Sequence, residues 1–351
     1  MKAIIHIGPH KTGTTTIQSH LKANYNNLAS KNIGYVPSSA VYVISACKPA
    51  GRFELDFSNF CYGQRHFQNP LFKNDPNFSQ NVWNGLSKQI DENVDSVLFS
   101  NETFSSLSDS EVSVLASFIK ERFDEIQIIV YLRRQPEIMV SYYGTMIEVA
   151  CRPLTFNDIL AASDDEVFWN YEALLTRWAN VFGKQNVTPR IFDRNHFINN
   201  DLIDDFFHTA GISMTNLIRI ENANHSMDQY STEFLRMFRK YVPFADDSGK
   251  NNVFDNRLIA TILRKHYKGS ASCIISRATA ESICERYKES NAAVSREWFG
   301  GQNIFNDDCS RYPEMVSDND LTLDKSIEIA SILWRELRLD HLRLQGLDGK
   351  L

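Results

Sequence analysis

The feature that most constrains the fold is a short apolar run that stops at a Gly-Pro pair and leads directly into a helical pattern. Residues 2–7 read KAIIHI, an apolar run rich in isoleucine, and predict a buried strand. From Thr14 onward, apolar residues at Ile17, Leu21 and Leu28 predict a helix that opens at the threonines. The order of strand, glycine-containing loop and helix is the setting in which a phosphate-binding loop occurs.

The loop has the glycine spacing of a P-loop but places its lysine elsewhere. Gly8 and Gly13 are separated by four residues and are followed by Thr14 and Thr15. A nucleoside-triphosphate P-loop carries lysine directly after the second glycine, whereas the lysine here is Lys11, three residues earlier. Backbone N–H groups at a helix start and the Lys11 charge form a site for an anion, together with nearby hydroxyl groups. Those hydroxyl groups belong to Thr12, Thr14, Thr15 and Thr16. The alternative is a Gly-Pro turn followed by a threonine N-cap, which needs no ligand.

The remaining pattern alternates strands and helices. Apolar runs predict strands at residues 96–100, 126–132 and 187–192. Helical patterns lie around residues 83–90, from Ser108 onward, and near 136–150, 167–182 and 201–210. This alternation predicts an α/β fold with a P-loop-like parallel β-sheet that helices flank on both faces.

Strand patterns fade beyond about residue 225. The later sequence has mostly helical patterns, among them residues 281–299 and 321–344. We therefore expect a core over residues 1–225 and a helical C-terminal part over 226–351, packed on the same domain. The long last helix has two interpretations, a cover for the sheet or an interface with another chain.

Residues 38–78 interrupt the core pattern. They are rich in aromatic residues, Asn, Gly and Pro and have no regular period. This composition favours an ordered insertion that makes contacts over a flexible linker. Arg52, Arg65 and His66 lie within it, so it is a candidate region for binding a sugar ligand, although its aromatic residues have packing as an alternative role.

Composition narrows the class of protein. The chain has 351 residues and a formal net charge of -6, which argues against a nucleic-acid-binding surface. Six scattered cysteines without a C-x-x-C pair favour reduced thiols over a disulfide framework or a zinc site. No apolar run approaches the ~20 residues of a membrane span, and the first run is too short for a signal peptide. We expect a cytoplasmic protein with no metal site and no membrane span.

Two further strand ends carry candidate functional residues. Arg133 follows the 126–132 strand and lies eight residues before Ser141, on the second turn of the next expected helix. A guanidinium and a hydroxyl group suit a phosphate monoester, although such an arginine is also common in surface ion pairs. Glu102 follows the 96–100 strand and is a candidate general base, or equally a carboxylate that the helix dipole favours without catalysis.

The segments PHKTGTT and YLRRQPEIMVS resemble the two signature segments of sulfotransferases that use 3′-phosphoadenosine 5′-phosphosulfate (PAPS). The resemblance is strongest to the bacterial and carbohydrate-acting branch and covers roughly residues 1–212, and more loosely the segment ESNAAVSREWFG. It implies that the loop binds the 5′-phosphosulfate and that Arg133 and Ser141 bind the 3′-phosphate. The loop residues concerned are Lys11, Thr12, Gly13, Thr14, Thr15 and Thr16. Because the following proline comes one place later than in the family, Arg134 stays open as an alternative to Arg133.

The resemblance also implies a reaction. Sulfuryl transfer from PAPS to an acceptor hydroxyl or amine would be direct and in line, without a metal, with Glu102 as the base and Lys11 beside the departing diphosphate. His10 is a second candidate for the base, or a hydrogen-bonding spacer in the loop. The acceptor is expected to be a glycan, a glycolipid or a small hydroxylated molecule. The alternatives are a P-loop nucleotide kinase, against which Thr14 counts, and a non-catalytic nucleotide- or glycan-binding protein.

Overall fold

The computed structural model describes residues 1–36, 78–88, 90, 93–150, 153–162, 169–221, 227–241, 253–267, 274–316 and 321–344. The described residues form one five-stranded sheet in the order β2-β3-β1-β4-β5, and every neighbouring pair is parallel. The strands are β1 (Lys2–His6), β2 (Ile33–Val36), β3 (Ser96–Ser100), β4 (Glu125–Leu132) and β5 (Val187–Ile191). The predicted fold class, a parallel sheet flanked by helices, is confirmed.

The central strand β1 shows why the apolar run forms a buried strand. Ile4 packs with one hydrophobic cluster, whereas Ala3 and Ile5 pack with the cluster on the other face of the sheet. Successive side chains of a strand point to opposite faces, so a strand covered on both sides must be apolar at nearly every position. The short edge strand β2 was not predicted, because its four residues include Gly34 and follow a helix without an apolar run of their own.

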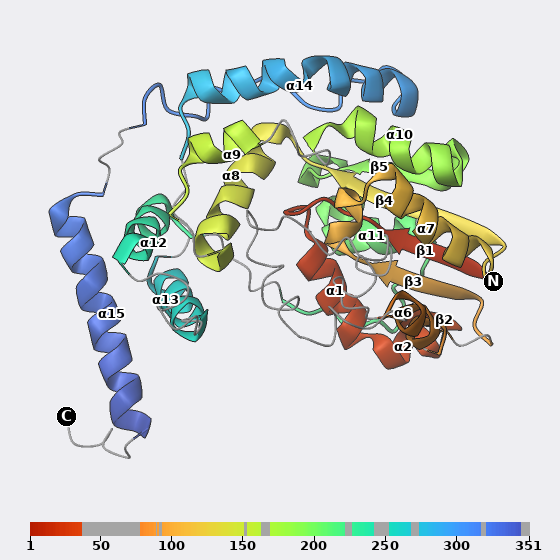
Figure 1. Ribbon diagram of the computed structural model, residues 1–351, viewed down its shortest axis with the longest axis horizontal. Helices are drawn as coiled ribbons and strands as arrows, with labels where there is room; N and C mark the ends of the chain where they lie inside the picture. Colours follow the sequence, from red (N-terminus) through yellow and green to blue (C-terminus); the bar gives the residue numbers. More distant parts are fainter. Residues whose placement is uncertain are drawn as a thin grey trace.

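Helices cover both faces of the sheet (Figure 1). On the face of Ile4 lie α1 (Thr14–Ala23), α2 (Tyr25–Ala29) and α11 (Leu202–Thr209). On the face of Ile5 lie α6 (Phe78–Ser87), α7 (Asp109–Lys120) and α10 (Tyr171–Phe182). The sequence SDSE at residues 108–111 has the pattern of a capping box, and this box is present at the start of α7, where Ser108 and Glu111 exchange hydrogen bonds with each other's backbone. Short helical turns connect these elements: η1 (Glu102–Ser106), η4 (Lys184–Asn186), η5 (Arg194–His196) and η6 (Ile198–Asn200).

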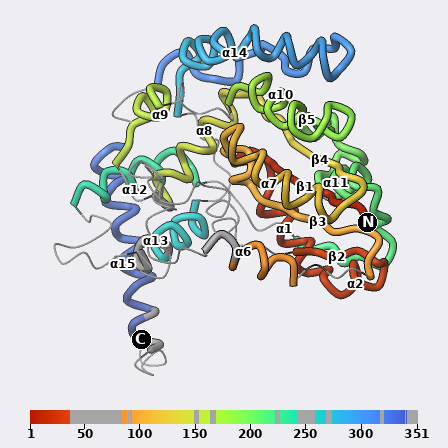
Figure 2. The backbone as a smooth tube through the Cα atoms, turned by 45° about the vertical axis from the view of Figure 1, so that its right-hand side comes forward, coloured from red at the N-terminus to blue at the C-terminus, as the bar shows by residue number. Residues whose placement is uncertain are grey.

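A third hydrophobic cluster joins the helices that follow β4 to those of the C-terminal part. The first group is α8 (Gln135–Thr145), the π-helical turn η2 (Met146–Ala150) and α9 (Phe156–Ala162). The second group is α12 (Gln229–Tyr241), α13 (Val253–His266), α14 (Arg277–Trp298) and α15 (Leu323–Leu344). Figures 1 and 2 show α14 beside α10, with α12, α13 and α15 at the end of the molecule away from the sheet.

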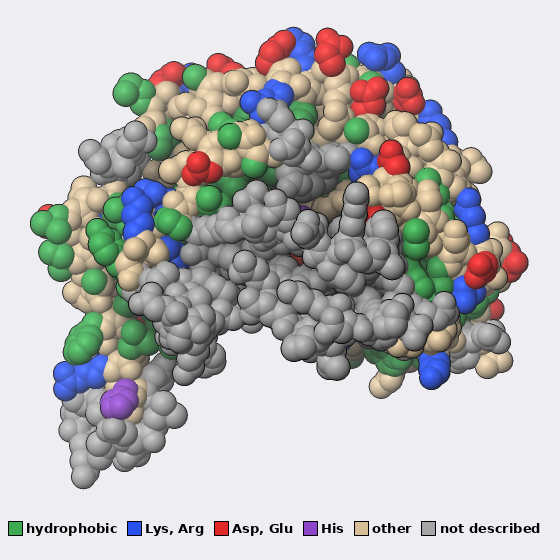
Figure 3. All heavy atoms as spheres, in the orientation of Figure 1, with side chains coloured by type: hydrophobic (Ala, Val, Ile, Leu, Met, Phe, Trp, Pro, Cys, Tyr) green, Lys and Arg blue, Asp and Glu red, His purple; other side chains and the backbone are tan. Residues whose placement is uncertain are grey.

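The last helix, α15, does not cover the sheet. It packs on α12 and α13, and its outer side exposes Leu323, Ile327 and Trp334, the last with 70% of its surface accessible. Hydrophobic side chains are visible along this helix in Figure 3. The candidate insertion at 38–78, with Arg52, Arg65 and His66, lies almost entirely outside the described residues.

The strand order places a topological switch point between β1 and β4. The chain leaves β1 through α1 towards β2, whereas it leaves β4 through α8 towards β5 on the other side of the sheet. In open α/β sheets the crevice at the carboxyl ends of two such strands is the usual ligand site. The loop after β1 and the Arg133–Arg134 pair after β4 both lie at this edge.

Candidate active site

The loop between β1 and α1 has the backbone geometry of an anion cradle. Gly13 has φ 77° and Lys11 has φ 65°, both in the left-handed region, and a Cβ on Gly13 would lie 2.3 Å from Leu202 Cδ2. Thr12 is fully buried and donates its hydroxyl proton to the Pro9 carbonyl over 2.7 Å, which braces the loop from within. The N-cap of α1 is Gly13, which has no side chain with which to cap the helix. Its first N–H groups therefore face the space that the loop surrounds.

A buried histidine that sequence reasoning did not select lies beneath this loop. The ring of His6 is fully buried, with Nδ1 at 2.8 Å from Ser100 Oγ. A Cβ on Gly8 would lie 2.7 Å from His6 Nε2, so glycine is required where the loop crosses the ring. Burial lowers the pKa of His6 to about 3, against a small opposing effect of Glu102, so this ring is neutral. The sequence signal that could have identified His6 is its position as a polar residue inside the apolar run IIHI.

Glu102 and the loop are joined directly. Thr14 donates its hydroxyl proton to Glu102 Oε2 over 2.8 Å, and His10 Nδ1 lies 3.6 Å from Glu102 Oε1. Burial acts to raise the pKa of Glu102, but His10, Thr14 and Lys11 together outweigh it and lower the pKa to about 2. The structure thus brings three predicted site residues, His10, Thr14 and Glu102, into one cluster in which the carboxylate is ionised.

Lys11 lies between charges of both signs. Its side chain is largely withdrawn from solvent, and this burial lowers its pKa, with Arg133 acting in the same direction. The carboxylates of Glu148 and Glu102 act in the opposite direction, and the effect of Glu148 is the larger. A partly desolvated ammonium group beside a second cation is poised to gain from an anionic ligand.

Arg133 reaches the loop from the end of β4. Its Nη1 donates to the Lys11 carbonyl oxygen over 3.0 Å, and its guanidinium lies 5.4 Å from the centre of the Phe192 ring. Nε lies 3.5 Å from Glu137 Oε2. The Tyr171 hydroxyl binds the backbone of Arg133 and fixes its position. Phe192 and Tyr171 were not selected from the sequence, although Phe192 directly follows β5 and so lies at the same edge of the sheet.

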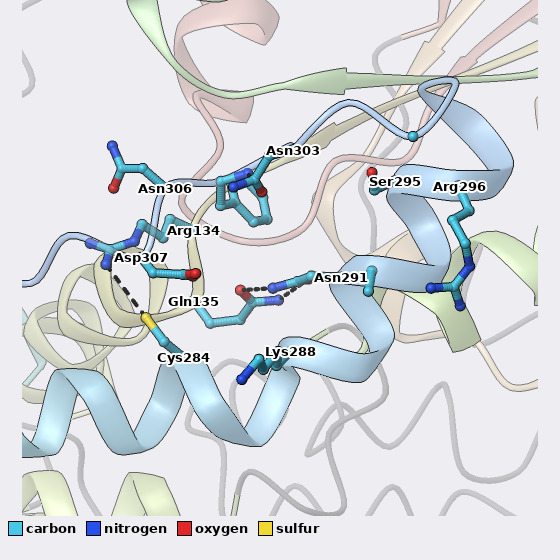
Figure 4. A pocket seen from close by; sticks show the side chains of 13 residues that line it. Arg134, Gln135, Cys284, Lys288, Asn291, Ser295, Arg296, Asn303, Asn306 and Asp307 are labelled. Atoms are coloured by element: carbon cyan, nitrogen blue, oxygen red, sulfur yellow. Dashed lines mark hydrogen bonds between the residues drawn. The ribbon is translucent and has the colours of Figure 1, made fainter.

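Arg134 points elsewhere. It is 7% exposed, and its Nη2 donates to the sulfur atoms of Cys309 and Cys284 over 3.1 and 3.4 Å. Figure 4 shows it directed towards Cys284 on α14, along a pocket of about 330 Å³ between α8 and α14. Both cysteines are free, as expected for reduced thiols, and their sulfur atoms are 3.9 Å apart. Of the two adjacent arginines, Arg133 is the one in contact with the loop.

The remaining predicted residues are placed as follows. Thr15 is exposed and Thr16 is half-buried, both in the first turn of α1. Ser141 is half-buried on the second turn of α8. The structure brings Lys11, Glu102 and Arg133 together. Within the described ranges, no hydrogen bond joins Ser141 to Arg133, and the role of Ser141 stays a prediction.

Among the residues that the structure describes, no group of three or more His, Cys, Asp or Glu side chains is arranged to hold a metal ion. In the same residues, no helix has the length and apolar character needed to cross a membrane.

Comparison with known proteins gives distant similarities. No family model matches the chain. An uncharacterised protein of Archaeoglobus fulgidus is 25% identical over 214 residues, which are 60% of this chain, and the chain spans 55% of that protein's length. Among solved structures, a sulfotransferase from Alicyclobacillus acidocaldarius matches with a TM-score of 0.41 and 17% identity, covering 62% of this chain and 85% of that one. Neither similarity is close enough to assign the chain to a family.

Proposed function

We propose that this chain is a sulfotransferase that takes a sulfuryl group from PAPS and transfers it to a hydroxyl group or an amine of an acceptor such as a glycan or glycolipid. The observation that carries the proposal is the contact between Arg133 and the backbone of Lys11. The two residues belong to the two segments whose resemblance implies binding of opposite ends of one nucleotide. Their contact at the switch point supports a single site for both anionic groups.

The residues at this edge fit such a donor. The loop offers backbone N–H groups at a helix start whose N-cap is a glycine, and Gly8 and Gly13 let the loop pass close to His6 and Leu202. Lys11 and Arg133 supply two positive charges, and the exposed hydroxyl of Thr15 adds a donor. Ser141 is proposed as a further ligand of the 3′-phosphate from the second turn of α8.

PAPS supplies a sulfuryl group: a bond forms between the acceptor oxygen or nitrogen and sulfur, and the bond from sulfur to the 5′-phosphate oxygen breaks. Lys11 and the N-terminus of α1 stabilise the negative charge of the departing diphosphate. Glu102 takes the acceptor proton. Its pKa of about 2 makes it a weak base in the free protein, but an anion bound beside it raises that pKa because like charges disfavour the ionised form.

His10 lies 3.6 Å from Glu102 and shares the same cluster. We assign it a supporting role, in which it orients the Glu102 carboxylate, and it stays the second candidate for the base. Exchange of His10 for Gln separates the two roles, since an amide can hold the carboxylate but cannot take a proton.

A nucleotide kinase is the alternative of a different reaction class. Its P-loop lysine would occupy the position of Thr14, whose side chain is buried and donates to Glu102. That position therefore offers no cation to a γ-phosphate, which favours the sulfotransferase proposal. A non-catalytic nucleotide- or glycan-binding protein is the third possibility, and the experiment below separates the three.

The test is a thermal-shift titration with 3′-phosphoadenosine 5′-phosphate (PAP), the diphosphate product, beside ATP–Mg²⁺. A ligand that binds only the native state adds about 2.7 kcal/mol at a hundredfold excess over Kd. We expect stabilisation by PAP in the wild type, its loss in Lys11→Ala, and its retention in Lys22→Ala, a matched exchange of an exposed lysine on α1.

Labelled PAPS then reports transfer to a glycan pool. Stabilisation by ATP–Mg²⁺ but not by PAP would favour the kinase. Binding of PAP without any transfer would favour the non-catalytic protein, and binding of neither nucleotide would refute the proposal.

A further inference from the structure

A single π-helical turn, η2, follows α8 and carries Glu148. π-helical turns inside or beside α-helices are rare and occur frequently at functional sites. Here the turn extends α8, the helix that begins two residues after Arg133. A side chain on η2 therefore belongs to the segment that already contributes to the candidate active site.

Glu148 is held by two arginines from the C-terminal helices. Arg264 on α13 forms an ion pair with the Glu148 carboxylate, and Arg239 on α12 donates to the Glu148 backbone carbonyl over 3.5 Å. The side chains of Glu148 and Arg264 are 17% and 35% exposed, so the pair is sheltered but open to a ligand. Both α12 and α13 pack on η2, which gives the pair a fixed position.

The helix that η2 continues contacts the loop: the ring of Tyr142 on α8, six positions before Glu148, lies 5.8 Å from the ring of His10. Among the charged side chains that the structure describes, Glu148 also has the largest effect on the pKa of Lys11, ahead of Glu102, and Arg264 contributes. Glu102 is occupied by Thr14 and His10. Glu148 is thus a second carboxylate near Lys11, contributed by a different part of the fold.

We propose that Glu148 and Arg264 bind the acceptor, and that the acceptor is a neutral sugar that presents two adjacent hydroxyl groups. This inference rests on the proposed function. A carboxylate accepts a hydrogen bond from one hydroxyl group, and a guanidinium donates to the neighbouring oxygen, so the pair matches a vicinal diol. Glu148 is then a specificity-determining residue, and the C-terminal helices form one wall of the acceptor site.

The surrounding charges argue for this class of acceptor. An amine would be protonated at neutral pH and would meet the cations Lys11, Arg133 and Arg264. The two carboxylates nearby, Glu102 and Glu148, already have partners in Thr14 and Arg264. An anionic acceptor would compete with Glu148 for Arg264. A neutral diol satisfies both members of the pair without adding a charge.

The experiment compares three variants by transfer of sulfate from labelled PAPS to methyl glucoside, glucosamine and methyl glucuronide. Glu148→Gln removes the carboxylate charge, and Glu148→Asp keeps it. Glu336→Gln is the matched control, since Glu336 pairs with Lys265 and His266 on the same helix α13. PAP stabilisation is measured for each variant, so that folding and donor binding are read separately from acceptor use.

We expect methyl glucoside to be the best acceptor of the three. Glu148→Gln should raise its KM by about tenfold or more, as loss of a charged hydrogen bond would, with PAP stabilisation unchanged or greater. Glu148→Asp should recover part of the loss, and Glu336→Gln should leave KM unchanged.

Two results would overturn the inference while leaving the proposed function intact. One is an unchanged acceptor KM in Glu148→Gln, or an equal change in Glu336→Gln, because the pair would then only connect η2 to α13. The other is a preference for glucosamine or methyl glucuronide, or no transfer to any of the three by a protein that does transfer sulfate to the glycan pool. A wild type that PAP does not stabilise would refute the proposed function itself, and the inference with it.

Discussion

The guanidinium of Arg133 donates to the backbone carbonyl of Lys11 over 3.0 Å, across 122 positions of the sequence. This bond connects the loop after β1 to the end of β4. It uses one of the five N–H groups of the side chain, and Nε donates to Glu137, so within the described residues three N–H groups stay available to an anion. The contact makes Arg133, not Arg134, the arginine to test in nucleotide binding.

Replacing Arg133 by alanine should affect nucleotide binding, whereas replacing Arg134 by alanine should affect the stability of the fold. Arg133→Ala should abolish stabilisation by PAP and leave the melting temperature of the free protein nearly unchanged. Arg134→Ala should retain the PAP effect but destabilise the protein by about 1–3 kcal/mol, since Arg134 is buried and donates to Cys284 and Cys309. Thermal-shift assays with and without PAP measure both effects, and loss of PAP binding in Arg134→Ala alone would reverse the assignment.

Gly13 should be intolerant of a side chain. Its φ of 77° and the 2.3 Å approach to Leu202 Cδ2 predict that Gly13→Ala destabilises the protein by about 1–3 kcal/mol. The control is Gly144→Ala within α8, where no atom lies within 4 Å of the added Cβ. That exchange should stabilise by up to about 1 kcal/mol. Urea denaturation distinguishes the two, and equal effects would contradict the proposed role of Gly13 in the loop geometry.

His6 should make stability fall as the solution becomes acidic. Its pKa is lowered from 6.5 to about 3 in the folded protein, so between these pH values the unfolded chain binds a proton at His6 and the native state does not. Stability is therefore complete above about pH 6.5 and is lost progressively as the pH falls towards 3. In His6→Asn, which keeps a polar group opposite Ser100, the free energy of unfolding should vary less between pH 6.5 and 5. An unchanged pH profile in this variant would show that other groups cause the acid sensitivity.

The hydrogen bond from Thr14 should contribute to the low pKa of Glu102. A carboxylate with its pKa lowered from 4.5 to about 2 stabilises the fold above pH 4.5, and this contribution is lost as the pH falls towards 2. Thr14→Val removes the donor and should cost about 1–3 kcal/mol at pH 7, with the difference from wild type shrinking below pH 4.5. Thr14→Ser keeps the hydroxyl and should behave like the wild type. If the stability difference between Thr14→Val and wild type did not depend on pH, the loss would come from altered packing and not from the hydrogen bond to the Glu102 carboxylate.

The sequence by itself determined the local elements and the edge at which they carry chemistry. The first part of the chain predicts a strand, a tight loop and a helix from an apolar run, two glycines and a threonine-rich helix start. These signals suffice because hydrophobic periodicity and the conformational freedom of glycine determine secondary structure within a few residues. The same holds for the strand that precedes Arg133 and for the capping box at Ser108. Parallel strands place their carboxyl ends together, so Lys11, Glu102 and Arg133 could be assigned to one edge in advance.

Only the tertiary structure decided which atoms meet there. Arg133 and Arg134 are adjacent in sequence, yet one faces the loop and the other faces two cysteines on and beyond α14, because packing sets the direction of each side chain. The neutral state of His6 depends on its complete burial, which neighbouring elements cause. Glu148 meets Arg264 through the packing of α13 on η2, and contacts over such distances in sequence leave no local pattern to read.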